Sequence, residues 1–271
     1  MGGKIVPGLD KVPETLLLTL AIRAREAQRP DALLIDQRAP AIMAMLDYDF
    51  SKIRMHAHDE TSVILRTVKI DAYVSAFLAS HANGAVIHIG CGLDTRFERV
   101  DNGRVEWFDL DLPEVIDLRR VLIGAGGGRY HLLSASILGE DWIPTVLSVP
   151  NRPCLFVAEG VMTYFEEAQA RRLVVKILDC FPGSELVCDV YSPFTVWADN
   201  LQLAVSRMSA RMHWGMKDPQ DVETWGAGIK LLEKWYFFDE PQPRWGAFRL
   251  LRFTPMAKSA GIFHYRLGSL T

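Results

Sequence analysis

The amino-acid sequence predicts an α/β fold: a doubly wound, Rossmann-like sheet, mostly parallel, with an antiparallel strand at its C-terminal end. From Ala85 to Tyr191, short apolar runs alternate with longer stretches of helical spacing. This alternation is typical of βα units and a parallel sheet. After Tyr191 the alternation stops, and two strand candidates, Ile229–Phe238 and Ile262–Leu267, predict a closing antiparallel pair.

Helices are expected before the first strand and between the strands. Apolar spacing predicts N-terminal helices at Pro13–Glu26, Ala39–Leu46 and Glu60–Leu78. The strands expected in the parallel part are Ala85–Ile89, Val105–Asp109, Arg129–Leu133, Cys154–Glu159 and Glu185–Tyr191. The helices expected after Ile89 include Glu114–Ile123, Glu166–Cys180 and a long one at Phe194–Met212, followed by a turn at Lys217–Gln220 and a Pro-broken helical stretch before Ile262.

Composition excludes several partners. The chain has 271 residues, 49% of them apolar, and a formal net charge of −3, so neither nucleic acid nor an anionic membrane is an expected partner. The apolar run at Leu16–Ile22 is too short to span a bilayer, and Asp10 and Glu14 precede it where an export signal would be basic. The four cysteines form no CxxC pair, which favours reduced thiols in a cytoplasmic protein.

The most informative motif follows the first expected strand. The apolar run from Ala85 breaks into Gly90-x-Gly92 and then Asp94-Thr95-Arg96, and a second strand ends in acids at Asp111. A glycine turn followed by an acidic strand end is how such sheets hold an adenosine ribose. The third glycine of the dinucleotide fingerprint is replaced by Thr95, which disfavours a diphosphate. An S-adenosylmethionine site needs no diphosphate cradle, and the closing antiparallel pair is also typical of methyltransferases rather than dehydrogenases.

Other motifs are interpreted as ordinary structure. The glycine-rich run Gly124–Gly128 follows a helix rather than a strand, so it predicts a loop. His56 and His58 have no second cluster of ligands nearby, so we expect a solvated loop and no metal. Ser62, Ser134 and Ser192 lie in no serine-hydrolase motif.

Three segments in the same order resemble the leucine carboxyl methyltransferase family, whose members are S-adenosylmethionine-dependent O-methyltransferases of the class I fold. They are Val86–Arg96, Phe108–Pro113 and Ala158–Tyr164. Within that family, the segments Val12–Thr15, Arg23-Ala24, Tyr48–Ser51 and His264-Tyr265 are similar to the tetracenomycin-type polyketide branch, which methylates small molecules.

The resemblance implies a set of cofactor contacts. Gly90, Cys91 and Gly92 would lie against the methionine part, and Asp111 would accept hydrogen bonds from the ribose hydroxyls. Asp109 is the alternative ribose ligand, since side chains two apart on a strand share a face.

Further contacts come from other strand ends and from the N-terminal helices. Glu159 would face the cofactor's positive charge, or alternatively act as an acid at a helix N-terminus. Arg66 would bind the cofactor carboxylate, with Arg23 as a weaker candidate. Ser134 or Ser136 would bond the adenine edge, although a helix N-cap explains Ser136 equally well.

The acceptor is expected to be a carboxylate, or a phenol, of a small polyketide-like or aromatic molecule. A carboxylate arrives ionised and needs no general base, and no His lies in a catalytic motif; His88 is expected to be packed inside its strand. No catalytic residue is assigned. The aromatic candidates for the acceptor pocket, each of which is alternatively a core residue, are Tyr164, Tyr191, Trp197, His213 and Trp214.

We therefore expect one methyltransferase domain over residues 1–271, acting as a monomer or homodimer. Its parts would be a helical cap (1–82), a cofactor-binding core (83–191), a helical insert (192–228) and the C-terminal strand pair (229–271). The alternatives are a nicotinamide-dependent oxidoreductase and a catalytically inactive protein that binds S-adenosylmethionine.

Overall fold

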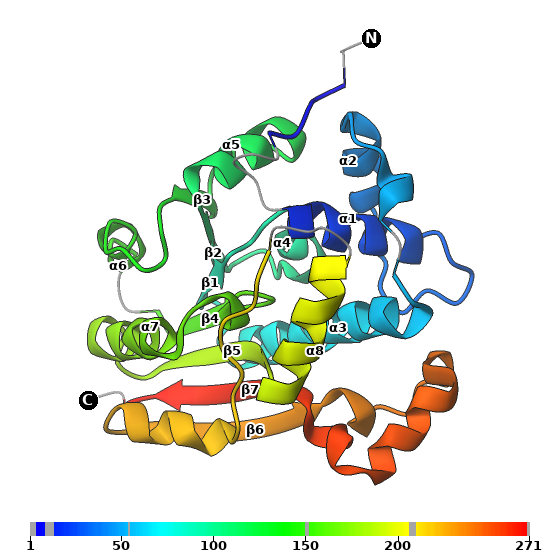
Figure 1. Cartoon of the computed structure of the whole chain (residues 1–271). Helices are drawn as coiled ribbons and strands as arrows, with labels where there is room; N and C mark the ends of the chain where they lie inside the picture. Colours follow the sequence, from blue (N-terminus) through cyan, green and yellow to red (C-terminus); the bar gives the residue numbers. More distant parts are fainter. Residues whose placement is uncertain (1–3, 9–13, 54, 150–151, 206–209, 270–271) are drawn as a thin grey trace.

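A seven-stranded sheet with helices on both faces forms the centre of the computed structural model (Figure 1). The structure describes residues 4–8, 14–53, 55–149, 152–205 and 210–269. The strand order is β3-β2-β1-β4-β5-β7-β6. The strands are β1 (Ala85–Ile89), β2 (Glu106–Asp111), β3 (Tyr130–Ser134), β4 (Cys154–Ala158), β5 (Ser184–Tyr191), β6 (Ile229–Tyr236) and β7 (Ala260–Leu267).

The pairing confirms the predicted sheet. β1 pairs in parallel with β2 and β4, which in turn pair in parallel with β3 and β5. β7 is antiparallel to both β5 and β6. The expected strands at 105–109 and 129–133 are each displaced by a residue or more at their ends, since β2 continues to Asp111 and β3 to Ser134.

The helices cover both faces of this sheet and its carboxyl edge (Figure 1). The α-helices are α1 (Glu14–Glu26), α2 (Ala39–Met45), α3 (Ala57–Ser80), α4 (Arg96–Val100), α5 (Pro113–Leu122), α6 (Ile143–Leu147), α7 (Glu167–Cys180) and α8 (Pro193–Val205). The 3-10 helices are η1 (Phe50–Lys52), η2 (Met162–Tyr164), η3 (Pro219–Trp225), η4 (Phe237–Asp239), η5 (Pro243–Phe253) and η6 (Pro255–Lys258).

Two expectations need correction. The continuous helix predicted from Phe194 to Met212 is wrong, because residues 210–217 are not helical; positions 206–209 lie outside the described residues. The side chain of Asn200 holds this segment against α8 by bonding both the amide and the carbonyl of Met212 (2.9 and 2.8 Å). His56 and His58 are not in a loop, since His56 is the N-cap of α3 and His58 lies in its first turn. The Pro-broken helical stretch is confirmed, and its two helices are of the 3-10 type.

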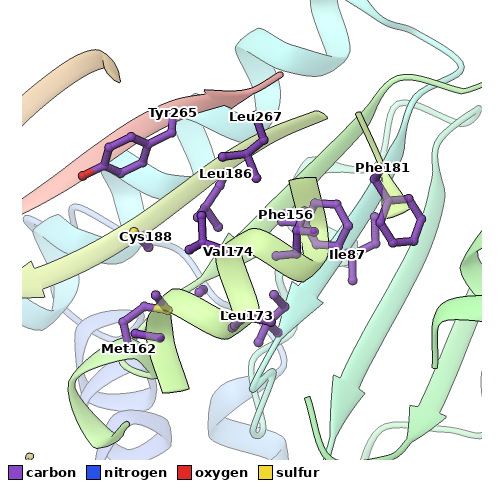
Figure 2. Packing of buried hydrophobic residues seen from close by; sticks show 14 of the residues in the cluster. Ile87, Phe156, Met162, Leu173, Val174, Phe181, Leu186, Cys188, Tyr265 and Leu267 are labelled. Atoms are coloured by element: carbon purple, nitrogen blue, oxygen red, sulfur yellow. The ribbon is translucent and has the colours of Figure 1, made fainter. Parts of the chain in front are cut away.

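Apolar side chains cover both faces of the parallel strands, which explains their nearly continuous apolar sequences. On one face, Ile87 and Phe156 pack with α7 residues such as Leu173 and Val174 (Figure 2). On the other face, the alternate strand residues pack against α3. A third cluster joins α1 and α2 to α5, and it holds Leu16 of α1 against the turn after β1.

Candidate functional site

Five predicted site residues lie at the carboxyl ends of five neighbouring parallel strands. Asp111, Ser134 and Tyr191 are the last residues of β2, β3 and β5, and Gly90 and Glu159 directly follow β1 and β4. The strand order reverses between β1 and β4, and ligands of open α/β sheets bind at such a point. The sheet therefore brings together residues that are up to 101 positions apart in sequence.

The glycine turn depends on glycine for two reasons. Gly90 and Gly92 have φ values of +61° and +51°, which other residues adopt only with strain. A Cβ atom at Gly90 would also lie 2.3 Å from Cγ2 of Val161. The turn is fixed by a hydrogen bond from the Gly90 amide to the carbonyl of Leu110 (2.8 Å), so its backbone is held at the edge of β2.

The carboxylate of Asp111 lies beside this turn and can accept further hydrogen bonds. One carboxylate oxygen accepts the Gly92 amide (2.8 Å), and the other accepts the amide of Leu112 (2.8 Å). Each carboxylate oxygen can accept a second hydrogen bond. Burial raises the pKa of Asp111, with the two amide bonds opposing the shift.

The carboxylate of Asp109 faces the protein interior, and its oxygens already accept hydrogen bonds from neighbouring side chains. Its carboxylate is 1% exposed and accepts bonds from the indole of Trp107 (2.8 Å), the hydroxyl of Tyr130 (2.6 Å) and the guanidinium of Arg119. Burial would raise the pKa of Asp109, but Arg119 and His88 outweigh it and lower the pKa. With its oxygens occupied in this way, Asp109 is not placed to bind a ribose.

Arg66 joins the ends of β4 and β5. Its Nε donates to Glu159 (3.0 Å), and its Nη1 donates to Asp189 (3.0 Å) and to the hydroxyl of Tyr191 (2.9 Å). Within the described part of the chain, Nη2 donates no hydrogen bond. Arg66 is buried, and a Cβ atom at Gly160, where φ is +64°, would lie 3.3 Å from Nη2, so this glycine leaves room beside that atom.

Glu159 is a paired carboxylate. Besides Arg66, it accepts a bond from the hydroxyl of Thr67 (2.8 Å) and pairs with Arg96. Burial would raise the pKa of Glu159, but Arg96 and Arg66 outweigh it and lower the pKa to about 2. The helix N-terminal alternative fails, because the next α-helix, α7, begins at Glu167 with Glu166 as its N-cap.

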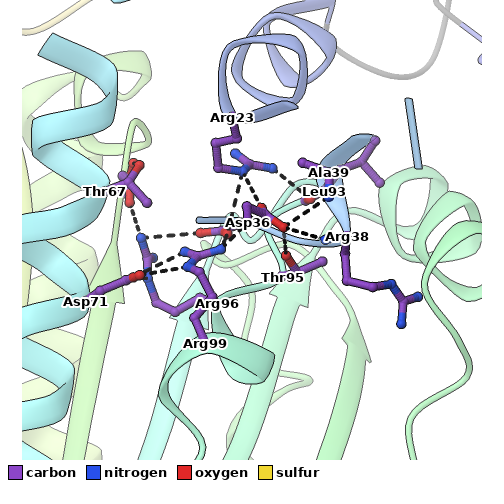
Figure 3. A network of polar contacts seen from close by, with 12 residues as sticks. Arg23, Asp36, Arg38, Ala39, Thr67, Asp71, Leu93, Thr95, Arg96 and Arg99 are labelled. Carbon is purple, nitrogen blue, oxygen red and sulfur yellow. Dashed lines mark hydrogen bonds and ion pairs between the residues drawn. The ribbon is translucent and has the colours of Figure 1, made fainter. Parts of the chain in front are cut away.

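The Asp-Thr-Arg part of the motif lies in a buried polar network that sequence analysis did not identify (Figure 3). Arg96 pairs with Asp71 (2.6 Å) and Glu159, and Thr95 donates to Asp36 (2.8 Å). Arg99 joins Asp71 and Asp94 (2.7 and 2.8 Å). Each residue type here is ordinary on a helix or loop, and only the fold makes them neighbours.

Arg23 and Arg119 complete the support of the turn. Arg23 pairs with Asp36 (3.0 Å) and donates to the carbonyl of Leu93 (2.8 Å), so it holds the cap to the turn. Arg119 of α5 donates to the carbonyls of Gly92 (2.7 Å) and Asp94 (2.8 Å). Both guanidinium groups bond carbonyls of the turn, whereas the Arg66 guanidinium bonds the acids at the ends of β4 and β5.

The remaining cofactor candidates lie at the same edge. Cys91 is buried in the turn, and burial raises the pKa of its thiol. Ser134 and Ser136 are exposed beside Asp111, whose carbonyl accepts the Ala135 amide (3.0 Å). The N-cap alternative for Ser136 is wrong, because α6 begins at Ile143 with Trp142 as its N-cap.

The candidate residues for the acceptor pocket differ in how far they are buried. Tyr164 and Tyr191 are half-buried, and Tyr191 contacts Arg66 directly. The His213 side chain is 43% exposed and pairs with Glu166 (3.1 Å). Trp214 is a core residue beside Trp225, and Trp197 faces outward on α8 with 58% of its surface exposed.

Metal-binding clusters and membrane-spanning helices were both sought among the residues that the structure describes. No group of three or more His, Cys, Asp or Glu side chains there could hold a metal ion. No helix among those residues is long and apolar enough to cross a bilayer. His88 is buried as expected, with Nε2 3.0 Å from the guanidinium of Arg96.

Known proteins share both the sequence and the fold. The family model described as leucine carboxyl methyltransferase matches residues 17–178. The tetracenomycin polyketide synthesis O-methyltransferase TcmP of Streptomyces glaucescens is 36% identical over 234 residues, which cover 86% of each chain. The S-adenosyl-L-methionine-dependent methyltransferase dpfgK of Gibberella zeae is 28% identical over 254 residues, covering 86% of this chain and 84% of that protein.

A solved structure supports the fold. A candidate methyltransferase from Thermobifida fusca superposes with a TM-score of 0.62 over 97% of this chain and 98% of that one, at 18% identity. At this identity the likeness establishes the fold alone.

The sheet order and the sequence matches together define an S-adenosylmethionine-dependent O-methyltransferase of the Rossmann-like class. The chain belongs to the leucine carboxyl methyltransferase family. The family, fold and reaction predicted from the sequence are confirmed, and neither the oxidoreductase nor the inactive binding protein is supported.

Proposed function

We propose that this enzyme transfers the methyl group of S-adenosylmethionine to a carboxylate oxygen of a small, aromatic, polyketide-like acceptor. The observation that carries the proposal is the pairing of two features at one sheet edge: the Asp111–Gly92 contact at the end of β2, and Arg66 at the ends of β4 and β5. The name of the Streptomyces relative and the family description support the acceptor class.

The residues fit the cofactor in charge and in hydrogen-bonding capacity. Asp111 would accept the ribose hydroxyls, and the backbone of Gly90, Cys91 and Gly92 would lie against the methionine part. The Nη2 atom of Arg66 would bind the cofactor carboxylate as a charge-assisted hydrogen bond.

Glu159 and the two serines complete this proposed cofactor site. Glu159, paired with two arginines, would orient Arg66 and add negative charge near the cofactor's ammonium and sulfonium groups. Ser134 and Ser136 would serve the adenine edge.

The reaction that the cofactor supplies is an in-line displacement. A carboxylate oxygen of the acceptor would form a bond to the methyl carbon while the sulfur–carbon bond broke and its electron pair stayed on sulfur. No proton is released from an ionised acceptor, so the chain needs no general base. Its work is to hold the two reactants in line and dry, which is worth about 7–11 kcal/mol.

The acceptor would lie between the cap, η2 and α8, where Tyr164, Tyr191 and His213 approach the edge of the sheet. Trp214 would support this wall from the core without touching the acceptor. Four free cysteines are consistent with a cytoplasmic enzyme acting on a free small molecule, as a monomer or homodimer.

The cofactor assignment is tested by calorimetry with S-adenosylhomocysteine. We expect binding to wild-type protein, a raised melting temperature and no effect of NAD. Asp111→Ala should weaken binding at least several-fold, while Asp117→Ala, at an exposed position on α5, should not. Unchanged affinity in Asp111→Ala would contradict the ribose contact.

The acceptor chemistry is tested by transfer of a labelled methyl group to aromatic acids. A methyl ester is cleaved by mild alkali, whereas a methyl ether survives it. Alkali-labile product supports carboxylate methylation, and alkali-stable product would show that a hydroxyl is methylated instead.

A further inference from the structure

A small cavity lies beside β5, β7 and β6, the three strands at one end of the sheet (Figure 1). Its volume is about 190 Å³, and its lining includes Tyr191 of β5, Tyr236 of β6 and Phe263 of β7. In the sheet, β4 and β5 separate β7 from β1. The cavity is therefore distinct from the glycine turn after β1, although it shares Tyr191 with the candidate acceptor site.

Lysines supply most of the charge in the lining of this cavity. Lys217 precedes η3, Lys234 lies on β6 and Lys258 ends η6, so three separate segments each contribute one lysine. Asp218, the acid of the lining, lies 3.7 Å from Lys234. Lys217 and Lys258 form no ion pair with any residue that the structure describes.

The acids near the cavity do not cancel this positive charge. Residues 241–271, which supply Lys258, contain no Asp or Glu. Asp239 accepts the amide of Tyr236 (2.9 Å) and so lies close by, but it does not line the cavity. With both Asp218 and Asp239 counted against the three lysines, one positive charge remains. A cavity lined by one sign of charge concentrates ions of the opposite sign, so this one favours an anion.

Buried apolar side chains form the other part of the lining. Val190, Met216 and Phe263 are 2%, 8% and 4% exposed. The ring of Tyr236 packs edge-on against Phe263, with 5.7 Å between the ring centres. A bare phosphate or sulfate would gain nothing from this surface, whereas an aromatic ring would be removed from water by it. The volume suits a single ring, since sites for drug-sized ligands measure about 300–1,000 Å³.

We propose that this cavity binds an aromatic carboxylate. The ring lies against Val190, Met216 and Phe263, and the carboxylate oxygens accept charge-assisted hydrogen bonds from the lysines. Two sources present this chemistry: a separate small aromatic acid, or a second carboxylate of the methyl acceptor, reached past Tyr191. The inference goes beyond the proposed function, and only the second source rests on it.

The test is a titration of the full chain without cofactor, followed by fluorine NMR at low ionic strength. The probes are 4-fluorobenzoate and the neutral 4-fluorobenzyl alcohol. We expect wild-type protein to bind the acid at least about fivefold more tightly than the alcohol. Lys217→Gln and Lys258→Gln should each weaken binding of the acid about threefold, the size expected for one partly exposed charge, and leave binding of the alcohol unchanged.

A variant with the opposite expected effect separates binding from a structural role. The Asp218 side chain caps η3 by accepting the amide of Gln220 (2.9 Å), and Asn can keep this bond. Asp218→Asn removes the acid from the lining, so it should tighten binding of 4-fluorobenzoate about threefold. Lys230→Gln, at an exposed position four residues before Lys234 on β6, is the matched control and should leave the affinity unchanged.

Methyl-transfer kinetics distinguish the two sources. If the acceptor supplies the carboxylate, naphthalene-2,6-dicarboxylate should have a KM several-fold below that of 2-naphthoate, and Lys217→Gln should remove the difference. If a separate molecule supplies it, the two KM values should be similar. Benzoate should then change the rate without competing with the acceptor, and Lys217→Gln should abolish that effect.

Three outcomes overturn the proposal. Equal affinity for 4-fluorobenzoate in wild-type protein, both lysine variants and Asp218→Asn would exclude the cavity as the site. Equal binding of the acid and the alcohol would exclude recognition of the charge. Tighter binding of inorganic phosphate than of 4-fluorobenzoate would exclude the aromatic part. The titration needs no cofactor, so its failure is distinguishable from failure of the Asp111→Ala and alkali-lability tests.

Discussion

Two sides of the sheet's carboxyl edge differ in how the charges of their acids are balanced. On the side of α1, α3 and α4, the acids Asp36, Asp71, Asp94 and Glu159 all pair with arginines. On the side of α8, Asp199 has no such partner among the described residues. The arginine-paired acids hold segments of the chain together, whereas Asp199 is left without such a partner and with a raised pKa.

This difference changes how the sequence motif is interpreted. In the Gly-x-Gly-x-Asp-Thr-Arg run, the glycines shape the turn at which the cofactor is proposed to bind, but the last three residues point into the arginine–acid network. Their role is to hold α1, α3 and the end of β4 around the turn. One continuous motif is thus proposed to serve binding in its first half, and it serves assembly in its second.

The largest expected effect comes from breaking another buried arginine–acid pair, the one between Asp109 of β2 and Arg119 of α5. Asp109→Ala should lower the free energy of unfolding by about 3–5 kcal/mol, because it leaves the Arg119 guanidinium buried without its carboxylate. The measurement is urea unfolding at pH 7. Asp111→Ala, two positions along the same strand, is the matched comparison and should lose much less stability.

Equal losses in the two variants would remove the distinction between an assembling and a binding carboxylate on β2. A small loss in Asp109→Ala alone would mean that the site relaxes to let water reach Arg119.

The next effect has the opposite sign. Because the pKa of Asp199 is raised to about 6, charging this group costs the folded state stability. The contribution of protonated Asp199 to the stability of the folded state is complete below the pKa that Asp has in the unfolded chain, near 4. It is lost as the pH rises through about 6. Asp199→Asn should therefore be more stable than wild-type protein by about 2 kcal/mol at pH 8, with the difference disappearing below about pH 4.

Thermal or urea unfolding across pH 4–8 checks this prediction. Destabilisation by Asp199→Asn at pH 8 would instead show that the carboxylate has a structural partner.

The sequence predicted the sheet well because each of β1 to β5 is a short apolar run bounded by turn residues, a pattern that depends only on neighbours along the chain. It also placed Gly90, Asp111 and Glu159 at strand ends, because parallel strands end at one edge. The arginine–acid network could not be predicted, since Asp36, Asp71 and Arg119 are ordinary until the fold brings them together. Trp214, a pocket candidate from the sequence, lies in the hydrophobic core, because an aromatic side chain gives the same sequence signal in a core and in a pocket.

The smallest effect on stability is expected at the edge of the proposed acceptor site. His213 and Glu166 form an ion pair at 3.1 Å with side chains that are 43% and 66% exposed, so solvent and salt screen it. His213→Ala should change the free energy of unfolding by less than about 0.5 kcal/mol. Any effect on catalysis must then come from contact with the acceptor.

Glu166→Gln removes the same pair but keeps the imidazole, which makes it the matched control. If His213 lines the acceptor site, KM for aromatic acids rises several-fold in His213→Ala and not in Glu166→Gln. Equal KM values in both variants would restrict the acceptor site to the sheet edge at Tyr164, Tyr191 and α8.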